Sequence, residues 1–367
     1  MRLGRRAREA FDWPLFIAVA ALAVIGVINL YSASSSESAR LAEIYVTQIY
    51  WLTLGAGTAV LVAAIDYRHY ERLAWWLYGG ATVLLGLVLL VGKTIRGSSR
   101  WIEVAGFTLQ PSEIVKLAVL VALAKVLHRD PRSEERSLRD LLAPGLVLAL
   151  PMVLILLQPD LGTAVLLALI FATVMLLVPL RRRSLVTLLA LAVGAAPLGW
   201  HFVLADYQRD RLRAFFDPTT DVLDSGWHAR QSLIAIGSGG LWGKGFMQGT
   251  QNQLHFLPDQ YTDFPFAVWA EEQGLLGVLL LLALYAFVVL RGLHVASLAR
   301  DRFGAVLAVG VCAFLFWHTV INLGMVMGLL PVVGVTLPLF SYGGSNVFAT
   351  LVGIGLLTNV SIRRFST

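Results

Sequence analysis

The sequence predicts an all-α, polytopic membrane protein with a single domain over residues 1–367. Hydrophobic residues make up 57% of the chain and charged residues 14%, and the mean hydropathy is +0.73. A soluble domain carries about 25% charged residues, and a disordered chain has low hydrophobicity, so both classes are excluded. The apolar residues form continuous runs, which excludes the alternating pattern of an outer-membrane β-barrel.

Ten apolar stretches are each long enough to cross the hydrocarbon core of a bilayer as a helix, which takes about 20 residues. The first follows several arginines, as a signal peptide does, but its apolar core of about 18 residues exceeds the usual hydrophobic region of a cleaved signal. We therefore expect an uncleaved anchor and about ten transmembrane helices. In chain order the stretches are 13–31, 46–65, 73–91, 111–128, 141–157, 161–180, 184–204, 264–290, 304–328 and 343–362.

The distribution of Lys and Arg predicts the orientation, because cytoplasmic connections are enriched in these residues. If the N-terminus is cytoplasmic and the helices alternate, about two thirds of the 29 basic residues lie inside. We therefore expect both termini in the cytoplasm. The longest connection, 205–263, then forms a large outer loop, and loops of this length are usually functional or disordered. Its aromatic residues argue against disorder, and its segment 227–238 predicts an amphipathic helix at the lipid–water boundary.

Asp263 lies where the outer loop meets the eighth stretch, at the predicted outer surface of the membrane. Partial desolvation at this depth raises the pKa of a carboxylate and makes it a better proton acceptor. The alternative is that Asp263 or Thr262 only caps the helix that follows, which is the commoner role for such residues.

Glu113 and Lys116 form a second candidate pair near the outer boundary. Pro111 is suited to the first turn of a helix, and side chains three residues apart share a helix face. A lysine in apolar surroundings needs a partner, which we expect to be Glu113 or Asp160, since Asp160 begins the sixth stretch at the same level. A structural ion pair and a functional role both stay open.

Basic residues on the outer side form a third group. A guanidinium can bind phosphate through two hydrogen bonds, although pairing with neighbouring aspartates or snorkelling to lipid headgroups explains most of these residues equally well. The glycine-rich segments 236–245 and 341–346, the second of which begins with Ser341, allow close backbone approach. Neither follows a strand, so neither is a P-loop or dinucleotide motif. The basic residues are Arg100, Arg209, Arg211, Arg213, Arg230 and Lys244.

Metal and transport functions receive little support. The seven histidines are scattered and Cys312 is the one cysteine, so no metal-ligand spacing is present. Asp263 with Asp259 or Glu271 could bind a divalent cation such as Mg²⁺ or Mn²⁺, but no spacing requires it. His318 and Asn322 are the notable polar residues deep in a stretch, whereas ion-driven transporters usually place charges near the midplane. We interpret His318 as a packing residue.

Five segments, in order across almost the whole chain, resemble the SEDS family (shape, elongation, division, sporulation) of polytopic peptidoglycan glycosyltransferases. Within that family, GLLPVVGVTLP is similar to the elongation branch, whereas the division branch tends to have a lysine there. The segments are RGSSRWIEVAGFTLQPSEIVKLA (96–118), QPDLGTA (158–164), RLRAFFDP (211–218), QSLIAIGSGGLWGKGFMQGTQNQLHFLPDQYTDFPFAVWAEEQG (231–274) and NLGMVMGLLPVVGVTLPLFSYGGS (322–345).

The resemblance implies that the substrate is lipid II, that the product is a β-1,4 glycan strand, and that undecaprenyl pyrophosphate is the leaving group. It places the reaction on the outer face of the bacterial cytoplasmic (inner) membrane, with a class B penicillin-binding protein as partner and no role for nucleic acid. The catalytic aspartate of the family's HTDF motif falls on Asp263. Tyr261 replaces the motif's histidine, Pro265 a usual aliphatic residue, and Asp259 the glutamate of a PEQ motif, which puts the local turn in question.

We therefore expect Asp263 to act as general base in an inverting displacement. Lys116, Arg100 and Arg213 are the candidate pyrophosphate contacts, because the leaving group develops negative charge. The remaining candidate substrate-binding residues are Glu113, Asp160, Lys244 and Ser341.

Three alternatives stay open: a lipid II flippase, a non-catalytic scaffold for a transpeptidase, and the division polymerase of the same family. A flippase needs a polar path through the bilayer, whereas the polar residues here gather at the outer end. A scaffold does not need the placement of Asp263 and Lys116.

Overall fold

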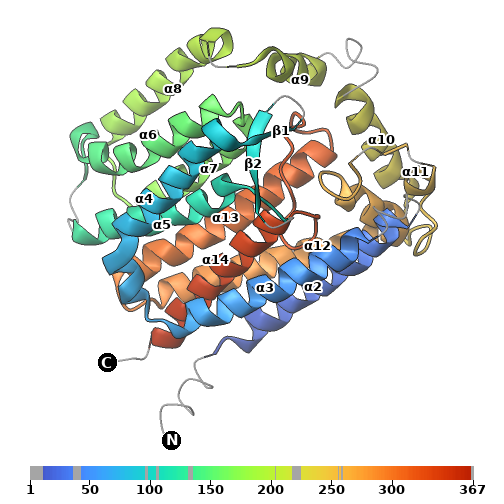
Figure 1. Cartoon of the computed structure of the whole chain (residues 1–367), viewed down its shortest axis with the longest axis horizontal. Helices are drawn as coiled ribbons and strands as arrows, with labels where there is room; N and C mark the ends of the chain where they lie inside the picture. The colour runs from blue at the N-terminus through green and yellow to red at the C-terminus, as the bar shows by residue number, and fades with distance from the viewer. Residues whose placement is uncertain are drawn as a thin grey trace, which may run out of the picture.

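The fold is a bundle of long helices with shorter elements at one end (Figure 1). The computed structural model describes residues 11–35, 43–95, 98–104, 107–130, 135–202, 204–216, 225–254, 256–257 and 259–364. The predicted all-α membrane protein is confirmed, since helices make up most of the described residues and the strands are few and short.

One long helix corresponds to each of the ten predicted apolar stretches. Seven of these helices are long and apolar enough to span a membrane, counting α6 with the preceding 3₁₀ turn Leu138–Leu141. Helix α7 is a shorter apolar helix, and α5 carries Glu113, Lys116 and Lys125, so the number of spans stays a prediction. The ten helices are α2 (Trp13–Ser34), α3 (Ile44–Ala64), α4 (Tyr67–Val91), α5 (Pro111–Arg129), α6 (Leu142–Leu157), α7 (Leu161–Met175), α8 (Arg182–Phe202), α12 (Pro265–Ser297), α13 (Arg302–Val326) and α14 (Gly344–Arg363).

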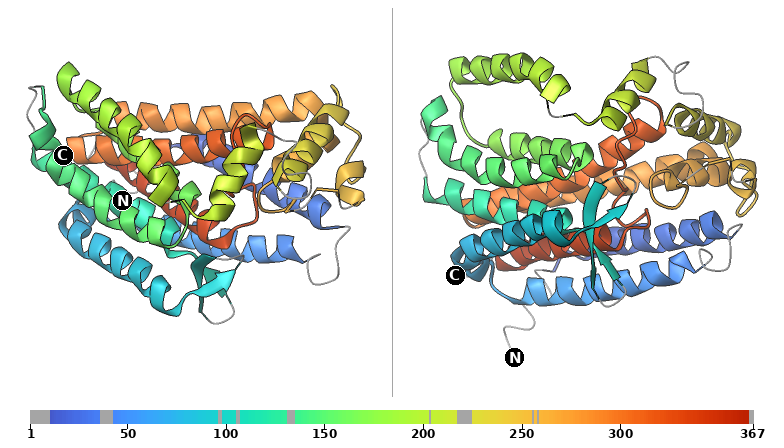
Figure 2. Two further views of the ribbon diagram at one scale, coloured as in Figure 1. Left: turned by 90° about the horizontal axis from the view of Figure 1, so that it is seen from above. Right: turned by 45° about the horizontal axis from the view of Figure 1, so that its top comes forward.

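Helices α13 and α14 form the centre of the bundle. In each of them 78% of the residues in the apolar window are buried, against 11% in α3, which faces outward. Glycines allow α14 to pack closely on α3, because a Cβ at Gly355 would lie 2.7 Å from the carbonyl oxygen of Ala59. Close approach through small residues is how helices associate in lipid, where burial of apolar surface gives little driving force. Helix α8 stands at the edge of the bundle (Figure 2), and Ser184 is its one buried residue among the side chains described.

The segments predicted to be cytoplasmic contact one another at one end of the bundle. The Tyr67 hydroxyl donates to Asp301 over 2.8 Å, and Arg291 pairs with Asp12 at 2.8 Å. Arg302 donates to the carbonyl of Asp130 over 3.0 Å. These contacts agree with helices that alternate in direction. Which end faces the cytoplasm stays a prediction.

The opposite end carries a short sheet and four connecting segments. The sheet has the antiparallel order β1–β2–β3, formed by Lys93–Ile95, Ser98–Val104 and Phe107–Leu109. These strands were not predicted from the sequence, in which 92–110 lies between two apolar stretches and was interpreted as a connection. The predicted outer loop contains the helices α9 (Asp206–Phe216), α10 (Ser225–Ser238) and α11 (Thr250–Gln253). Helix α10 confirms the helix expected at 227–238, and its Ser232 hydroxyl donates to the Val326 carbonyl at the end of α13 over 2.7 Å.

Helix α12 is broken at Gly274, whose φ of 63° and ψ of −165° are not helical. Residues 239–245 insert beside the break and replace the lost helical hydrogen bonds. The amides of Lys244 and Gly245 donate to the carbonyls of Glu271 and Glu272, both over 3.0 Å, and the Leu275 amide donates to the Gly240 carbonyl over 2.9 Å. Irregular backbone in a membrane protein requires such internal partners. Gly239 and Gly243 allow this close packing, because a Cβ on either of them would overlap a carbonyl oxygen of α12.

Candidate functional site

The described residues enclose a cavity of about 450 Å³ at the end of the bundle that carries the sheet. Its lining comes from α3, β2, β3, the N-terminal parts of α5 and α7, α9, α13, and the segments 259–263, 333–336 and 342–346. Elements far apart in the sequence thus meet in one polar chamber. Of the eight site residues predicted from the sequence, four line it: Asp263, Glu113, Asp160 and Arg100.

Asp263 lies in a turn directly before α12 and is partly exposed to the cavity. The amides of Thr262 and Asp263 donate to the carbonyl of Asp259 over 3.1 and 3.0 Å, which forms the turn. Helix α12 has Phe264 at its N-cap and no side-chain capping hydrogen bond. The N-cap position is thus held by Phe264, one residue after Asp263, and the Thr262 hydroxyl donates to the Asp259 carbonyl over 3.4 Å.

Two segments on either side of Asp263 hold it in place. The side-chain amide of Asn322 in α13 donates to the Asp263 carbonyl over 3.0 Å. The Tyr342 amide donates to the Tyr261 carbonyl over 2.8 Å, so the segment after α13 is bonded to the same turn. A Cβ added to Gly334 would lie 3.6 Å from Oδ2 of Asp263, which places the carboxylate against this glycine.

Glu113 and Lys116 form the predicted ion pair, with Lys116 Nζ 2.8 Å from Glu113 Oε1. Nζ also lies 2.8 Å from His318 Nε2 and 5.2 Å from the ring centre of Phe314. Asn346 donates to the other oxygen of Glu113 over 3.1 Å. Lys116 is fully buried and does not line the cavity, whereas Glu113, His318 and Asn346 do. His318 packs against Phe314, with 4.5 Å between the ring centres, and also belongs to this polar network.

Asp160 pairs with Arg100 at 3.4 Å and not with Lys116. Its Oδ1 also accepts from the Thr163 amide over 3.2 Å and so caps α7. Arg100 bonds to the Pro159 carbonyl and, over 3.0 Å, to the Tyr207 hydroxyl. The guanidinium of Arg100 thus lies on the cavity wall, fixed by groups from α7 and α9.

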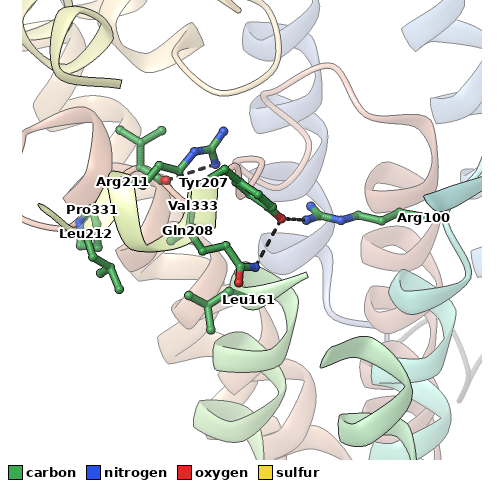
Figure 3. A pocket seen from close by; sticks show the side chains of 10 residues that line it. Arg100, Leu161, Tyr207, Gln208, Arg211, Leu212, Pro331 and Val333 are labelled. Atoms are coloured by element: carbon green, nitrogen blue, oxygen red, sulfur yellow. Dashed lines mark hydrogen bonds between the residues drawn. The ribbon is translucent and has the colours of Figure 1, made fainter. Parts of the chain in front are cut away.

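Arg211 lies on the other side of Tyr207, above the ring, with its guanidinium carbon 5.8 Å from the ring centre (Figure 3). Its Nη1 donates to the Val332 carbonyl over 3.3 Å. Among the described residues it has no carboxylate partner. Both Arg100 and Arg211 line the main cavity and a small adjoining recess, so two cations face the same space.

Arg213 does not reach the cavity. Its side chain is 62% exposed and pairs with Asp210 at 3.1 Å, which is the pairing that the sequence analysis gave as the alternative. Successive helical residues are about 100° apart, so Arg211 and Arg213 point to nearly opposite faces of α9. Tyr207, Gln208 and Arg211 share the inward face at helical spacing, and this pattern was the signal that sequence reasoning missed.

Lys244 and Ser341 also lie outside the cavity lining. Lys244 Nζ is 2.6 Å from Glu271 Oε1, beside the break in α12. Ser341 is buried, and its hydroxyl accepts a hydrogen bond from the Leu337 amide over 2.8 Å. Both residues thus support the backbone of the loops around the site, and their substrate contacts stay a prediction.

Of the two residue pairs predicted to bind a divalent cation, Asp263 with Asp259 and Asp263 with Glu271, only the first lies in the cavity. Asp259 and Asp263 both line the cavity, whereas the Glu271 carboxylate is engaged by Lys244 and by the Thr250 hydroxyl, 3.0 Å away. The residues that the structure describes contain no group of three or more His, Cys, Asp or Glu side chains that could hold a metal. A resident metal therefore stays an untested expectation.

A family model covering FtsW, RodA and SpoVE, described as cell cycle protein, matches residues 13–365. The chain belongs to the FtsW/RodA/SpoVE family. Among curated members of this family, the peptidoglycan glycosyltransferase MrdB of Escherichia coli K12 is 40% identical over 353 residues, which cover 96% of this chain and 94% of MrdB. The peptidoglycan glycosyltransferase RodA of Treponema pallidum is 31% identical over 432 residues, covering 98% of this chain and 99% of that protein.

Solved structures of this family have the same fold. A chain of a peptidoglycan synthase complex described as coordinating polymerization and crosslinking superposes with a TM-score of 0.82 at 34% identity, over 97% of this chain and 99% of that chain. The crystal structure of the rod shape determining protein RodA of Thermus thermophilus gives a TM-score of 0.72 at 33% identity, over 97% and 98% of the two chains. The family resemblance drawn from the motifs is thus confirmed.

Proposed function

We propose that the chain is a peptidoglycan glycosyltransferase of the elongation type, which polymerises lipid II into β-1,4 glycan strands. The observation that carries this proposal is that the Asp263 carboxylate and the guanidiniums of Arg100 and Arg211 line one cavity. The names of the curated relatives support the same activity. The motif GLLPVVGVTLP supports the elongation branch. The identities of 40% to MrdB, 31% to RodA of Treponema pallidum and 34% to a probable FtsW of Geobacter sulfurreducens do not separate the two branches.

Asp263 acts as the general base. A sugar hydroxyl is a weak nucleophile at neutral pH, and a positioned carboxylate that takes its proton contributes about 10²- to 10⁴-fold to the rate. The hydroxyl oxygen of the acceptor forms a bond to the anomeric carbon of the donor, and the bond from that carbon to the diphosphate breaks. The proton passes to Asp263, and the configuration at the anomeric carbon inverts.

Arg100 and Arg211 bind the diphosphate that leaves. Negative charge grows on it as the bond breaks, and fixed cations in a site of low dielectric stabilise such charge. Arg211 takes the role that the sequence analysis gave to Arg213. Lys116 acts indirectly, because its charge holds Glu113 at the cavity wall.

Membership of the family also supports a membrane location and a partner protein for the reaction. We infer a multi-pass protein of the bacterial inner membrane whose cavity opens on the outer face, where the acidic residues exceed the basic ones. The match to a chain of a peptidoglycan synthase complex supports a crosslinking partner, for which a class B penicillin-binding protein is the natural class.

Purified protein in liposomes with lipid II tests the proposal. We expect glycan strands on gels from the unsubstituted protein and from Asp210→Ala, whose aspartate is 63% exposed, and none from Asp263→Asn. Translocation of lipid II without polymer would support the flippase instead. Neither activity in the unsubstituted protein would support the scaffold, and full polymerisation by Asp263→Asn would overturn the general-base mechanism.

A further inference from the structure

Asn322 connects the two segments between which the Asp263 carboxylate lies. It projects from α13 and is completely buried. Its side-chain nitrogen donates to the Asp263 carbonyl over 3.0 Å and to the Val335 carbonyl over 2.7 Å. Val335 follows Gly334, the residue that faces Oδ2 of Asp263. One amide group thus bonds the backbone on both sides of this carboxylate.

The two acceptors lie in irregular backbone, and this explains why an amide is needed. The segments before α12 and after α13 cannot satisfy their own carbonyl groups as a helix does, and an unsatisfied carbonyl in a buried site is costly. A carboxamide nitrogen carries two donor hydrogens, so a single asparagine satisfies both carbonyls. An aspartate of the same shape has no such donors when ionised and would repel them.

We propose that Asn322 is the positioning residue for Asp263. It holds the general base against Gly334, in the cavity that Arg100 and Arg211 also line. This inference rests on the proposed function of Asp263. Asn322 does not line the cavity, so its effect on the reaction passes through the backbone of Asp263. A misplacement of about 1 Å of a catalytic group costs about 100-fold in rate.

The chain offers a matched control in Asn359 of α14. This asparagine is also completely buried, and its side-chain nitrogen donates to the carbonyl of Val62 over 2.6 Å and to that of Ile65. It also donates two hydrogen bonds to backbone carbonyls, but at the end of the bundle away from the cavity. The Asn359 side-chain oxygen also accepts from the Tyr67 amide over 3.2 Å and from Arg363 over 2.8 Å, so its loss gives an upper bound on the general cost of removing such a bridge.

The experiment measures kcat and KM for lipid II with full-length Asn322→Ala, Asn322→Ser, Asn322→Asp and Asn359→Ala, each checked by gel filtration and thermal unfolding. We expect Asn322→Ala to lower kcat by about 100-fold with KM unchanged, and Asn322→Ser, which keeps one donor, to lose less. Asn359→Ala should keep the kcat of the unsubstituted protein. If Asn322→Ala does not fold, the serine and aspartate variants carry the test.

The pH profile tests how near position 322 lies to the base. Asn322 Nδ2 lies 3.0 Å from the Asp263 carbonyl oxygen. An ionised carboxylate at this position disfavours the charged form of the base, so Asn322→Asp should move the acidic limb of kcat/KM to higher pH by about one unit. The other titratable groups that line the cavity with Asp263 are unchanged in every variant, so the shift isolates position 322. They are Asp259, Glu113, Asp160, His318, Arg100, Arg211, Tyr207, Tyr261 and Tyr342.

The outcomes distinguish this inference from the proposed function. Unchanged kcat in the folded Asn322 variants, or equal losses for Asn322→Ala and Asn359→Ala, would each overturn the positioning role. If Asp263→Asn is inactive in the same assay, the general base stands even then. Activity of Asp263→Asn would instead overturn the proposed function itself.

Discussion

Gly334 faces the carboxylate of Asp263 so closely that a single added carbon would touch it. A Cβ at Gly334 would lie 3.6 Å from Oδ2 of Asp263, and Gly334 adopts a φ of +70°. The space and the backbone conformation thus both favour glycine beside the proposed general base. Any larger side chain would occupy the position where an acceptor hydroxyl must approach the carboxylate.

We predict that Gly334→Val abolishes polymerisation and that Gly334→Ala lowers kcat. The left-handed backbone conformation costs a non-glycine residue about 1–2 kcal/mol, so both variants also lose stability. Gly328→Ala is the matched control, because Gly328 has a φ of +66° in the same connection and its nearest neighbour would be Leu233, 3.4 Å away. Thermal unfolding should show similar losses for the two alanine variants. Equal kcat values for them would contradict the role of Gly334 in the site.

Arg211 and Arg213 give a second paired prediction. Hydrogen bonds to charged groups contribute about 1.5–3 kcal/mol, so Arg211→Met should lower kcat/KM for lipid II by about 10- to 100-fold. Arg213→Met should leave it unchanged, since that side chain is 62% exposed and only pairs with Asp210. Steady-state kinetics with both variants checks the difference. A larger loss from Arg213→Met would return the diphosphate contact to the residue that the sequence first suggested.

The contrast between these arginines shows what the sequence could and could not predict. The ten long helices follow from apolar runs, because burial in lipid requires long continuous apolar segments. The sequence left Glu113 and Asp160 as possible partners of Lys116. The structure shows the ion pair with Glu113, three residues away on the same helix face. Tyr207 and Asn346 were missed as site residues, and Arg211 was named among the basic residues but not chosen, since their importance depends on contacts between distant segments.

Lys244 and Ser341 were expected beside the other site residues but do not line the cavity, for a related reason. Both lie in glycine-rich segments that suggested a phosphate site, but close backbone approach also serves helix packing. The break in α12 could not be foreseen, because Gly274 ends one run of helical hydrogen bonds and residues 239–245 replace them from outside the helix. The short sheet was missed as well, since its strands Lys93–Ile95 and Phe107–Leu109 are only three residues long.

For the ion pair of Glu113 and Lys116, we predict that the stability losses of the two single substitutions do not add in the double variant. Lys116→Met leaves the buried Glu113 carboxylate without its cation, and breaking one side of a buried ion pair costs about 3–5 kcal/mol. Glu113→Gln combined with Lys116→Met should recover most of that stability, because no uncompensated charge remains. The double variant should still be inactive if Glu113 works at the cavity wall. Thermal unfolding of the single and double variants gives the coupling, and additive losses would show that the two groups do not act as a pair.

The break in α12 predicts a difference between two glycines of the inserted loop. A Cβ at Gly243 would overlap the carbonyl oxygen of Glu272, whereas a Cβ at Gly240 would have nothing within 4 Å, and both residues have positive φ. Gly240→Ala should therefore lose only the conformational cost of about 1–2 kcal/mol. Gly243→Ala should in addition displace the loop, expose the unpaired carbonyls of Glu271 and Glu272, and disturb Asp263 at the start of the same helix. Limited proteolysis of the loop and polymerisation assays measure both effects, and identical behaviour of the two variants would mean that the insertion does not hold the broken helix in place.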